Sequence, residues 1–234
     1  MLSIFALGFL IGLRHTLEAD HVAAVATLTT QTASVRQAVP LGLLWGAGHT
    51  LSLGCFGLAS LLLGAALPQD LALYLELAVG VMLIGLGADV LIRMIRQRIH
   101  FHAHRHHGGV VHFHAHGHEQ NHNRDHDHIH LRGPAGALRL RAFLIGIMHG
   151  MAGSAVLVVL TLQAVPSVTA GLGYIALFGA GSIFGMAALS AAIAWPLAHW
   201  GRPLSWLHNT ARVGTGVLTI GLGIAILFEG SPIF

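Results

Sequence analysis

Five ionisable side chains fall within residues 14–21, RHTLEADH, near the start of an otherwise apolar sequence. Two of them are the histidines His15 and His21, and Asp20 directly precedes the second. Imidazole nitrogens combined with carboxylate oxygens suit borderline first-row divalent cations such as Ni²⁺, Co²⁺ or Zn²⁺. The single cysteine, Cys55, lies in an apolar stretch, so no thiolate site for Cu⁺ is expected. The segment is therefore a candidate metal site.

The spacing of these residues restricts how one ion can be held. At about 100° per residue, His15 and His21 lie about 240° apart on a regular helix, and Asp20 lies about 140° from His15. Either the helix unwinds near 16–20, or only some of the three coordinate while the others orient ligand histidines. A purely structural reading also exists, in which Arg14 pairs with Glu18 or Asp20 in a neutral packing network.

The composition around this segment indicates an integral membrane protein. The chain has 234 residues, of which 54% are hydrophobic and 9% are charged, whereas soluble domains carry about 25% charged residues. Spanning a bilayer takes about 20 mostly apolar residues. Six segments meet this requirement, at roughly 2–30, 38–66, 71–95, 138–164, 168–198 and 208–230.

The basic residues orient these spans. All are arginines, and they gather in the loops on one side, above all in and beside the polar segment 96–137. The positive-inside rule makes that side cytoplasmic. We therefore expect a multi-pass inner (plasma) membrane protein with both termini outside and a cytoplasmic central loop. Because the arginines cluster instead of forming a stripe, no nucleic acid is expected as a partner.

Three ordered sequence matches suggest an internal duplication. FLIGLRH (9–15) recurs as FLIGIMH (143–149), GAGH (46–49) as GAGS (179–182), and VGVMLIGLG (79–87) as TGVLTIGLG (215–223). Three spans per repeat force the second repeat to insert upside down, as in many transporters. The expected fold is all-α, with six transmembrane helices arranged as two inverted three-helix repeats: residues 1–95, a His-rich cytoplasmic loop at 96–137, and residues 138–234.

The duplication extends the candidate site. His149 occupies the place of His15 in the second repeat. His49 lies in the second span, and Ser182 is the residue that corresponds to it in the second repeat. Ionisable groups at membrane depth usually mark a pathway or site, and a pseudo-twofold axis would bring these positions to one cavity. As alternatives, His49 bonds a neighbouring backbone group and His149 packs between helices.

At this point the sequence resembles the nickel/cobalt transporters (the NiCoT/NicO family), in particular the six-span, urease-linked branch. RHTLEADHVAAV is similar to that family's H-x4-D-H signature helix, GAGHTLSL to its next conserved span, and LIGIMHGMAGSAVLVVL to the corresponding span of the six-helix branch. The resemblance implies Ni²⁺ or Co²⁺ as the transported substrate. It makes His15, Asp20 and His21 essential metal-handling residues and His49 a second-span participant. Nickel chaperones or urease assembly factors are the partners it implies, besides the metal ion and the lipid bilayer.

The central segment holds 13 of the 19 histidines. Such a tract binds metal by composition, without a fixed geometry. In the cytoplasm it would buffer arriving ions or collect ions for export; the alternative is that it is dispensable. HEQNH (118–122) matches the zinc metalloprotease pattern, but chance matches are expected where histidines are so dense, and we reject it.

The sequence thus predicts a permease and not an enzyme, with no catalytic cofactor; oligomers are compatible with it. Uptake is the expected direction, and efflux is the alternative because His-rich cytoplasmic loops also occur in exporters of the family. A membrane metalloenzyme would need a further acid/base group, for which Glu18 is the spare candidate. A metal-storage or metal-sensing protein would use the loop instead of the spans.

Overall fold

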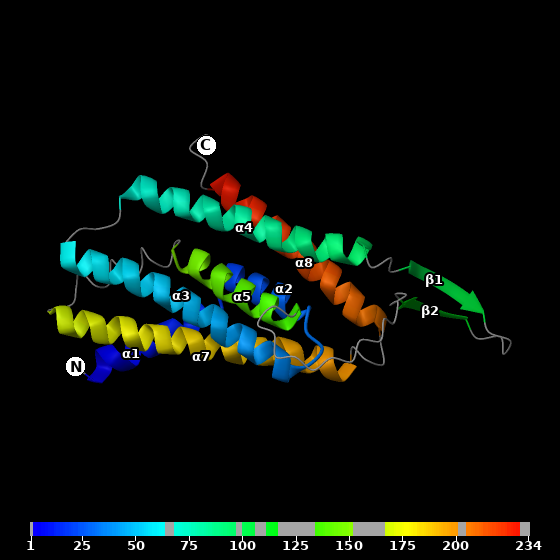
Figure 1. Ribbon diagram of the computed structural model, residues 1–234, viewed down its shortest axis with the longest axis horizontal. Helices are drawn as coiled ribbons and strands as arrows, with labels where there is room; N and C mark the ends of the chain where they lie inside the picture. Colours follow the sequence, from blue (N-terminus) through cyan, green and yellow to red (C-terminus); the bar gives the residue numbers. More distant parts are fainter. Residues whose placement is uncertain are drawn as a thin grey trace.

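The computed structural model describes residues 2–63, 68–96, 100–105, 111–116, 134–151, 167–200 and 205–229. Within these residues the chain forms seven helices and one two-stranded hairpin (Figure 1). The helices are α1 Leu2–His15, α2 Ala19–Thr29, α3 Val35–Leu63, α4 Gln69–Arg96, α5 Pro134–Gly150, α7 Val168–Trp200 and α8 Ser205–Glu229, and the strands are β1 His100–Arg105 and β2 Val111–His116.

Four helices are long and apolar enough to cross a membrane. The candidate spans are Val35–Leu63 in α3, Asp70–Arg96 in α4, Val168–His199 in α7 and Asn209–Glu229 in α8. These correspond to four of the six expected spans. Such helices are typical of an integral membrane protein, because about 20 apolar residues suffice to cross the hydrocarbon layer.

The first expected span, 2–30, is not one continuous helix. α1 ends at His15 and α2 begins at Ala19, with Glu18 in an extended conformation between them (φ −63°, ψ 146°). The Thr16 hydroxyl donates to the Leu13 carbonyl at 2.7 Å, which satisfies one of the carbonyl groups freed at the helix end. Of the two alternatives that the spacing left open, unwinding near 16–20 is therefore the one adopted.

The fourth expected span, 138–164, begins earlier than the sequence predicted. α5 starts at Pro134, inside the segment assigned to the loop, and ends at Gly150, one residue after His149. Residues 152–166 lie outside the described residues. α1 and α5 thus end at corresponding places, directly at or after the histidine of FLIGLRH and FLIGIMH.

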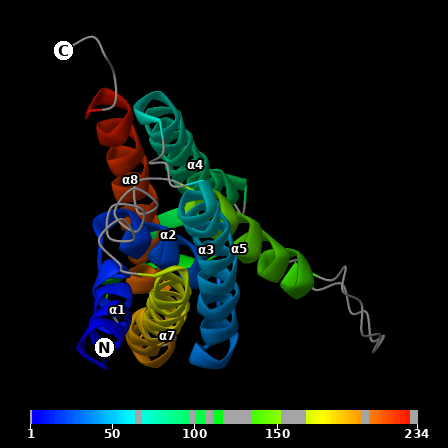
Figure 2. The ribbon, with the colours of Figure 1, turned by 90° about the vertical axis from the view of Figure 1, so that its left-hand side faces the viewer.

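The helices form two groups with α2 between them (Figure 2). α1, α7, α3 and α5 lie side by side in that order, and α4 packs along α8. α2 contacts members of both groups, namely α3, α7, α4 and α8. The short helix α2, which follows the interruption at residues 16–18, is therefore surrounded by the long helices.

Glycines allow the backbones to approach closely within the first group. A side chain at Gly12 of α1 would meet the backbone of Phe178 on α7, and one at Gly146 of α5 would meet the backbone of Trp45 on α3. Small residues at helix crossings bring membrane helices into direct contact. As a result, side chains that project from neighbouring helices near these crossings are held at short range.

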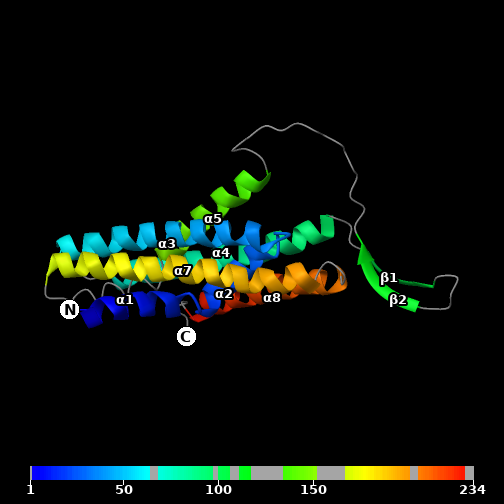
Figure 3. The same ribbon diagram turned by 90° about the horizontal axis from the view of Figure 1, so that it is seen from below.

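The hairpin departs from the expected all-α fold. β1 and β2 pair antiparallel within the segment that the sequence assigned to a polar His-rich loop. They lie at the end of the bundle where α4 and α7 end and α3 and α8 begin (Figures 1 and 3). The expected all-α class holds for the rest of the described chain, where every element is a helix.

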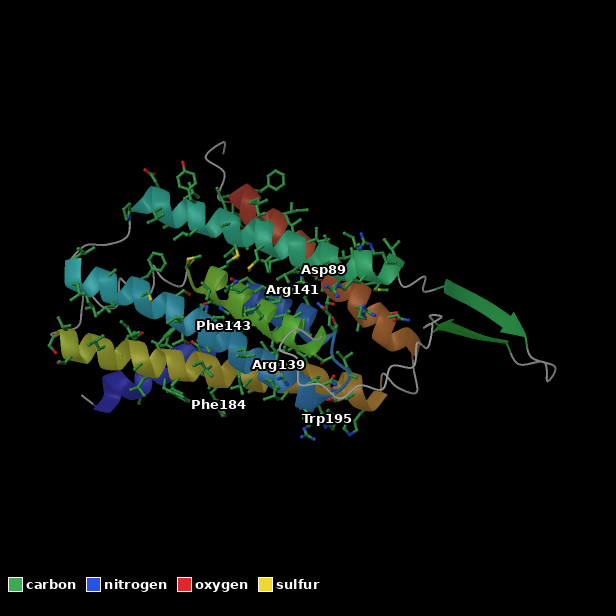
Figure 4. All side chains as sticks on the ribbon, viewed as in Figure 1. Asp89, Arg139, Arg141, Phe143, Phe184 and Trp195 are labelled. Carbon is green, nitrogen blue, oxygen red and sulfur yellow. The ribbon has the colours of Figure 1, made fainter. Side chains whose placement is uncertain are left out.

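An ion-pair cluster joins α4 to α5. Asp89 accepts hydrogen bonds from Arg93 Nε at 3.0 Å and from Arg141 Nη1 at 2.6 Å (Figure 4). All three side chains are partly exposed, and pairs of this kind contribute about 0–1 kcal/mol. The cluster positions α5 against α4 more than it stabilises the fold.

Candidate metal centre

Four histidines from four helices meet in the interior. His15 ends α1, His21 lies in the first turn of α2, His49 is in the middle of α3, and His149 lies near the end of α5. At most 4% of each of these residues is exposed. The His21 ring is central, with its centroid 4.3 Å from that of His15, 5.2 Å from that of His49 and 4.2 Å from that of His149.

Two carboxylates hold these rings in place. His15 Nδ1 lies 2.9 Å from Glu18 Oε1. Asp20 uses both oxygens: Oδ1 is 3.0 Å from His21 Nδ1, and Oδ2 is 3.0 Å from His149 Nε2. When these nitrogens donate their protons to the carboxylates, the opposite ring nitrogens become free lone pairs, the arrangement typical of ligand histidines.

The interruption between α1 and α2 makes this arrangement possible. Unwinding at residues 16–18 lets Glu18 fold back to His15 and turns α2 so that Asp20 and His21 face the same interior space as His15. Arg14 is exposed, and in the described part of the chain both carboxylates bond to histidines. The neutral network with Arg14 that the sequence allowed is therefore not the one formed.

Several ring nitrogens in this cluster have no protein partner. Among the described residues, no hydrogen bond reaches His15 Nε2, His21 Nε2, His149 Nδ1 or either nitrogen of His49, and all are buried. A buried polar atom without a partner costs about 1–3 kcal/mol. Metal coordination is one way to satisfy such atoms, and the alternative in which His49 bonds a neighbouring backbone group does not occur.

The donor atoms form two overlapping groups of three. His15, His21 and His49 each offer a ligand atom, all within 4.8 Å of one another, and so do Asp20, His21 and His149. We call them the three-histidine triad and the aspartate triad. His21 belongs to both. All five residues named from the sequence thus lie together, although nothing in this geometry identifies an ion.

Aromatic rings from α3 and α7 border the cluster. Trp45 lies 5.6 Å from both His21 and His149, and Phe178 lies 5.5 Å from His15, measured between ring centroids. An apolar shell of this kind limits water access and fixes ring orientation. The sequence analysis missed Trp45, although its place one turn before His49 in WGAGH was a signal.

Among the described residues, the second half of the chain adds no histidine besides His149 to the cluster. Ser182, which corresponds to His49, is buried and donates to the Gly12 carbonyl at 3.2 Å. The two halves of the chain therefore contribute unequally to the cluster, with five of its six residues, Glu18 included, coming from the first 95 positions.

Fold and site together define a helical membrane protein with a buried histidine–carboxylate cluster. No family model and no solved structure matches the chain. Among curated proteins, the urease accessory protein UreH of Bacillus sp. (strain TB-90) is 32% identical over 229 residues, which are 98% of this chain and 92% of the relative. The chain belongs to the family of that urease accessory protein. Its relative is an accessory protein of an enzyme, in agreement with the expectation that this chain is not itself an enzyme.

A second relative comes from a plant. The chloroplast protein FOR GROWTH AND FERTILITY 1 of Arabidopsis thaliana is 28% identical over 236 aligned positions. These cover 97% of this chain but 59% of that protein. The helical unit described above is thus similar to part of a longer plant protein.

Proposed function

We propose that the protein is a membrane permease that carries Ni²⁺, or Co²⁺, into the cytoplasm through the buried histidine–carboxylate cluster. The observation that supports this most strongly is the convergence of four buried histidines from α1, α2, α3 and α5, with five ring nitrogens that lack a protein partner. Ionisable groups in this position are costly in a membrane protein and usually line a substrate pathway. Membership in the family of a urease accessory protein supports a role in supplying metal for urease assembly.

The donor set favours a borderline divalent cation. Imidazole nitrogens dominate and one carboxylate is present, which suits Ni²⁺, Co²⁺ and Zn²⁺ better than Mg²⁺ or Ca²⁺. The single cysteine, Cys55, is exposed. The resemblance of RHTLEADH to the signature of nickel/cobalt transporters selects nickel or cobalt within this class.

The two triads suggest how an ion is held and passed on. His15, His21 and His49 provide three neutral nitrogens, while Glu18 and Asp20 orient the first two rings. Asp20 and His149 bind the ion in the adjacent position, with His21 common to both positions. Because His21 belongs to both groups, the two positions adjoin each other and an ion moves only a short distance between them.

The packing also favours the inverted duplication. Equivalent helices pack on each other, α3 on α7 and α4 on α8, and each pair runs in opposite directions (Figure 1). α1 packs on α7 as α5 packs on α3. Close glycine contacts follow the same exchange: Gly48 faces Phe143 and Ile147, and its counterpart Gly181 faces their counterparts Phe9 and Leu13.

Six spans in two inverted repeats would place the cluster near the midplane, where rocking of one repeat against the other exposes it alternately. Arginine placement then makes the hairpin end of the bundle cytoplasmic and both termini external. On this proposal the hairpin meets ions that have already entered, and cytoplasmic nickel chaperones or urease assembly factors receive them.

Accumulation of radioactive ⁶³Ni²⁺ by cells without their own nickel systems tests the proposal. We expect wild type to accumulate nickel above background and His21→Ala to abolish this, because both triads lose their common ligand. His199→Ala is the matched control, since His199 is exposed and bonds only the Trp195 carbonyl among the contacts seen for its ring nitrogens. Equal accumulation by wild type and His21→Ala would refute the proposal for nickel.

The same assay decides between uptake and efflux. Accumulation below background that depends on His21 would make the protein an exporter. The metalloenzyme alternative is less favoured because its spare acid/base candidate, Glu18, is hydrogen-bonded to His15. A storage protein would lose its role when 100–130 is deleted, whereas a permease would still transport.

A further inference from the structure

Apolar side chains follow the cluster histidines along three helices. Each of α2, α3 and α5 carries one of these histidines and, one and two turns away on the same helix face, two apolar residues. At most 7% of any of the six is exposed, and all belong to one packed apolar group. We call them the hairpin-side layer. Its members are Val25 and Leu28 on α2, Trp45 and Leu41 on α3, and Ile145 and Ala142 on α5.

The hairpin-side layer lies between the histidines and the end of the bundle that carries the hairpin. α3 begins at that end, so Trp45 precedes His49 on the way into the bundle (Figure 1). α5 runs parallel to α3, because Gly146 faces Trp45 and Gly150 faces His49. α2 leads from His21 to the same end, because a short connection joins it to the start of α3.

A second apolar group borders the cluster on the opposite side. It lies one turn after His49 on α3 and in the N-terminal part of α7, the helix that begins at the end away from the hairpin (Figure 1). We call it the far-side layer, and at most 7% of any member is exposed. Its members are Leu53, Tyr174, Ile175 and Phe178.

We propose that the two layers are the gates of the transport site and that both are closed in this structure. Hydrophobic constrictions exclude water and hydrated ions, so an ion at the cluster reaches either side only when one layer parts. This inference rests on the proposed transport function, because a gate serves a site that exchanges its cargo.

The helices that form each layer explain how a layer parts. Each layer joins helices from the two halves of the chain, since α3 meets α5 in the hairpin-side layer and α7 in the far-side layer. Rocking of one repeat against the other would separate the helices of one layer while the other stays packed. The cluster is then open to one side at a time.

One aromatic ring in each layer lies against the cluster itself. Trp45 is fully buried, and its ring centroid is 5.6 Å from those of His21 and His149. The Phe178 ring centroid is 5.5 Å from that of His15. Because these are the bulkiest groups next to the histidines, removal of either ring should open its own layer and leave the other closed.

A single thiol between the layers tests this arrangement. Cys55→Ser removes the only cysteine of the chain, and His49→Cys then places one thiol a turn away from Trp45 on one side and from Leu53 on the other. The rate at which a charged, membrane-impermeant maleimide labels this thiol is measured in right-side-out and inside-out membrane vesicles. The measurement needs neither metal nor transport.

We expect Trp45→Ala to raise the labelling rate from one side of the membrane by at least about tenfold, because labelling follows the population in which a layer is open. Phe178→Ala should raise it from the opposite side. Both variants are compared with the parent that carries only the Cys55→Ser and His49→Cys changes.

Two exposed rings on α7 provide matched controls. Trp195→Ala and Phe184→Ala remove the same side chains outside the layers, where 53% and 61% of these residues are exposed (Figure 4), and should label as the parent does. Val25→Thr and Phe178→Leu keep most of the packed volume and replace the two alanine variants if these do not fold. Each should raise labelling from the same side as the variant that it replaces.

An increase from the same side for both layers would overturn the proposal, and so would rates equal to those of the control variants. Neither outcome touches the transport function, which the ⁶³Ni²⁺ assay tests separately. Opposite-sided labelling in a protein that accumulates no nickel would keep the two gates and refute nickel as the cargo.

Discussion

The buried cluster and the β1–β2 hairpin use histidine in two different ways. In the cluster, four rings arrive from four separate helices and are held by two carboxylates in an apolar shell. In the hairpin, six histidines lie on two neighbouring strands, whose backbone register sets each of these positions opposite another. The cluster is organised by the packing of the whole bundle, whereas the hairpin is built by local strand pairing and contacts α8 through β2.

This difference determines which of the two regions is expected to keep its structure without further support. Close helix contacts hold the cluster's rings together, so its geometry is expected to exist before an ion arrives. A two-stranded hairpin, by contrast, is marginally stable on its own in water. A permease needs a preformed site that releases its ion.

The largest effect is expected from disturbing the packing that organises the cluster. A Cβ at Gly48 would meet the Phe143 carbonyl and the Ile147 backbone nitrogen, so Gly48→Ala forces α3 and α5 apart. We expect a loss of about 1–3 kcal/mol of stability and loss of nickel transport, because this crossing sets the distance from His49 to His149. Thermal unfolding in detergent and ⁶³Ni²⁺ uptake measure the two.

The matched control for that variant is Gly85→Ala, since nothing lies within 4 Å of a Cβ at Gly85. Gly181→Ala should resemble Gly48→Ala, because it meets the equivalent backbone atoms of Phe9 and Leu13. A harmless Gly48→Ala would show that the cluster does not depend on this helix contact.

A smaller effect is expected from removing one ligand. His49→Ala takes one nitrogen from the three-histidine triad and leaves the aspartate triad complete. We expect the initial rate of nickel uptake into proteoliposomes to fall by at least about 10- to 100-fold, the loss typical of removing a group that only orients a ligand. Ser182→Ala, at the corresponding place in the second half, should transport nearly as wild type. Similar rates for the two variants would exclude His49 from the site.

The smallest effect is expected at the carboxylate that orients His15. Glu18→Ala removes the acceptor for His15 Nδ1 and should weaken nickel binding by about 10-fold, at the lower end for such groups. Glu18→Gln keeps an acceptor oxygen and should recover most of the affinity, measured by titration of the purified protein. Glu76→Gln is the control, because the Glu76 side chain is exposed on α4. If Glu18→Gln binds as poorly as Glu18→Ala, the negative charge matters and not the orientation of the ring.

The sequence predicted the composition of the cluster well because its signals were local or repeated. H-x4-D-H marked His15, Asp20 and His21, and the match between FLIGLRH and FLIGIMH drew attention to His149. Whether the helix unwinds between His15 and His21 stayed open, because periodicity states only that an intact helix would separate them. The structure decides this through the turn at 16–18 and the hydrogen bond of Thr16 to Leu13.

Two features needed more than the sequence analysis used. The bond of Glu18 to His15 depends on the helix break. The sequence analysis therefore considered Glu18 only as a partner of Arg14 or as a spare acid/base group. The hairpin was interpreted as low complexity because histidine density obscured its pattern. HFHAH and HFHAH alternate with period two, which is a strand signal, but the register that pairs them depends on the segment between the strands.

X-ray absorption at the nickel edge tests the central claim most directly. Purified protein lacking residues 100–130 is loaded with one equivalent of Ni²⁺ and compared with the same protein carrying His21→Ala. We expect scattering from about three imidazole ligands in the first sample, and its loss in the second. A spectrum of water-coordinated nickel, or one that His21→Ala leaves unchanged, would contradict the assignment of the buried cluster as the metal site.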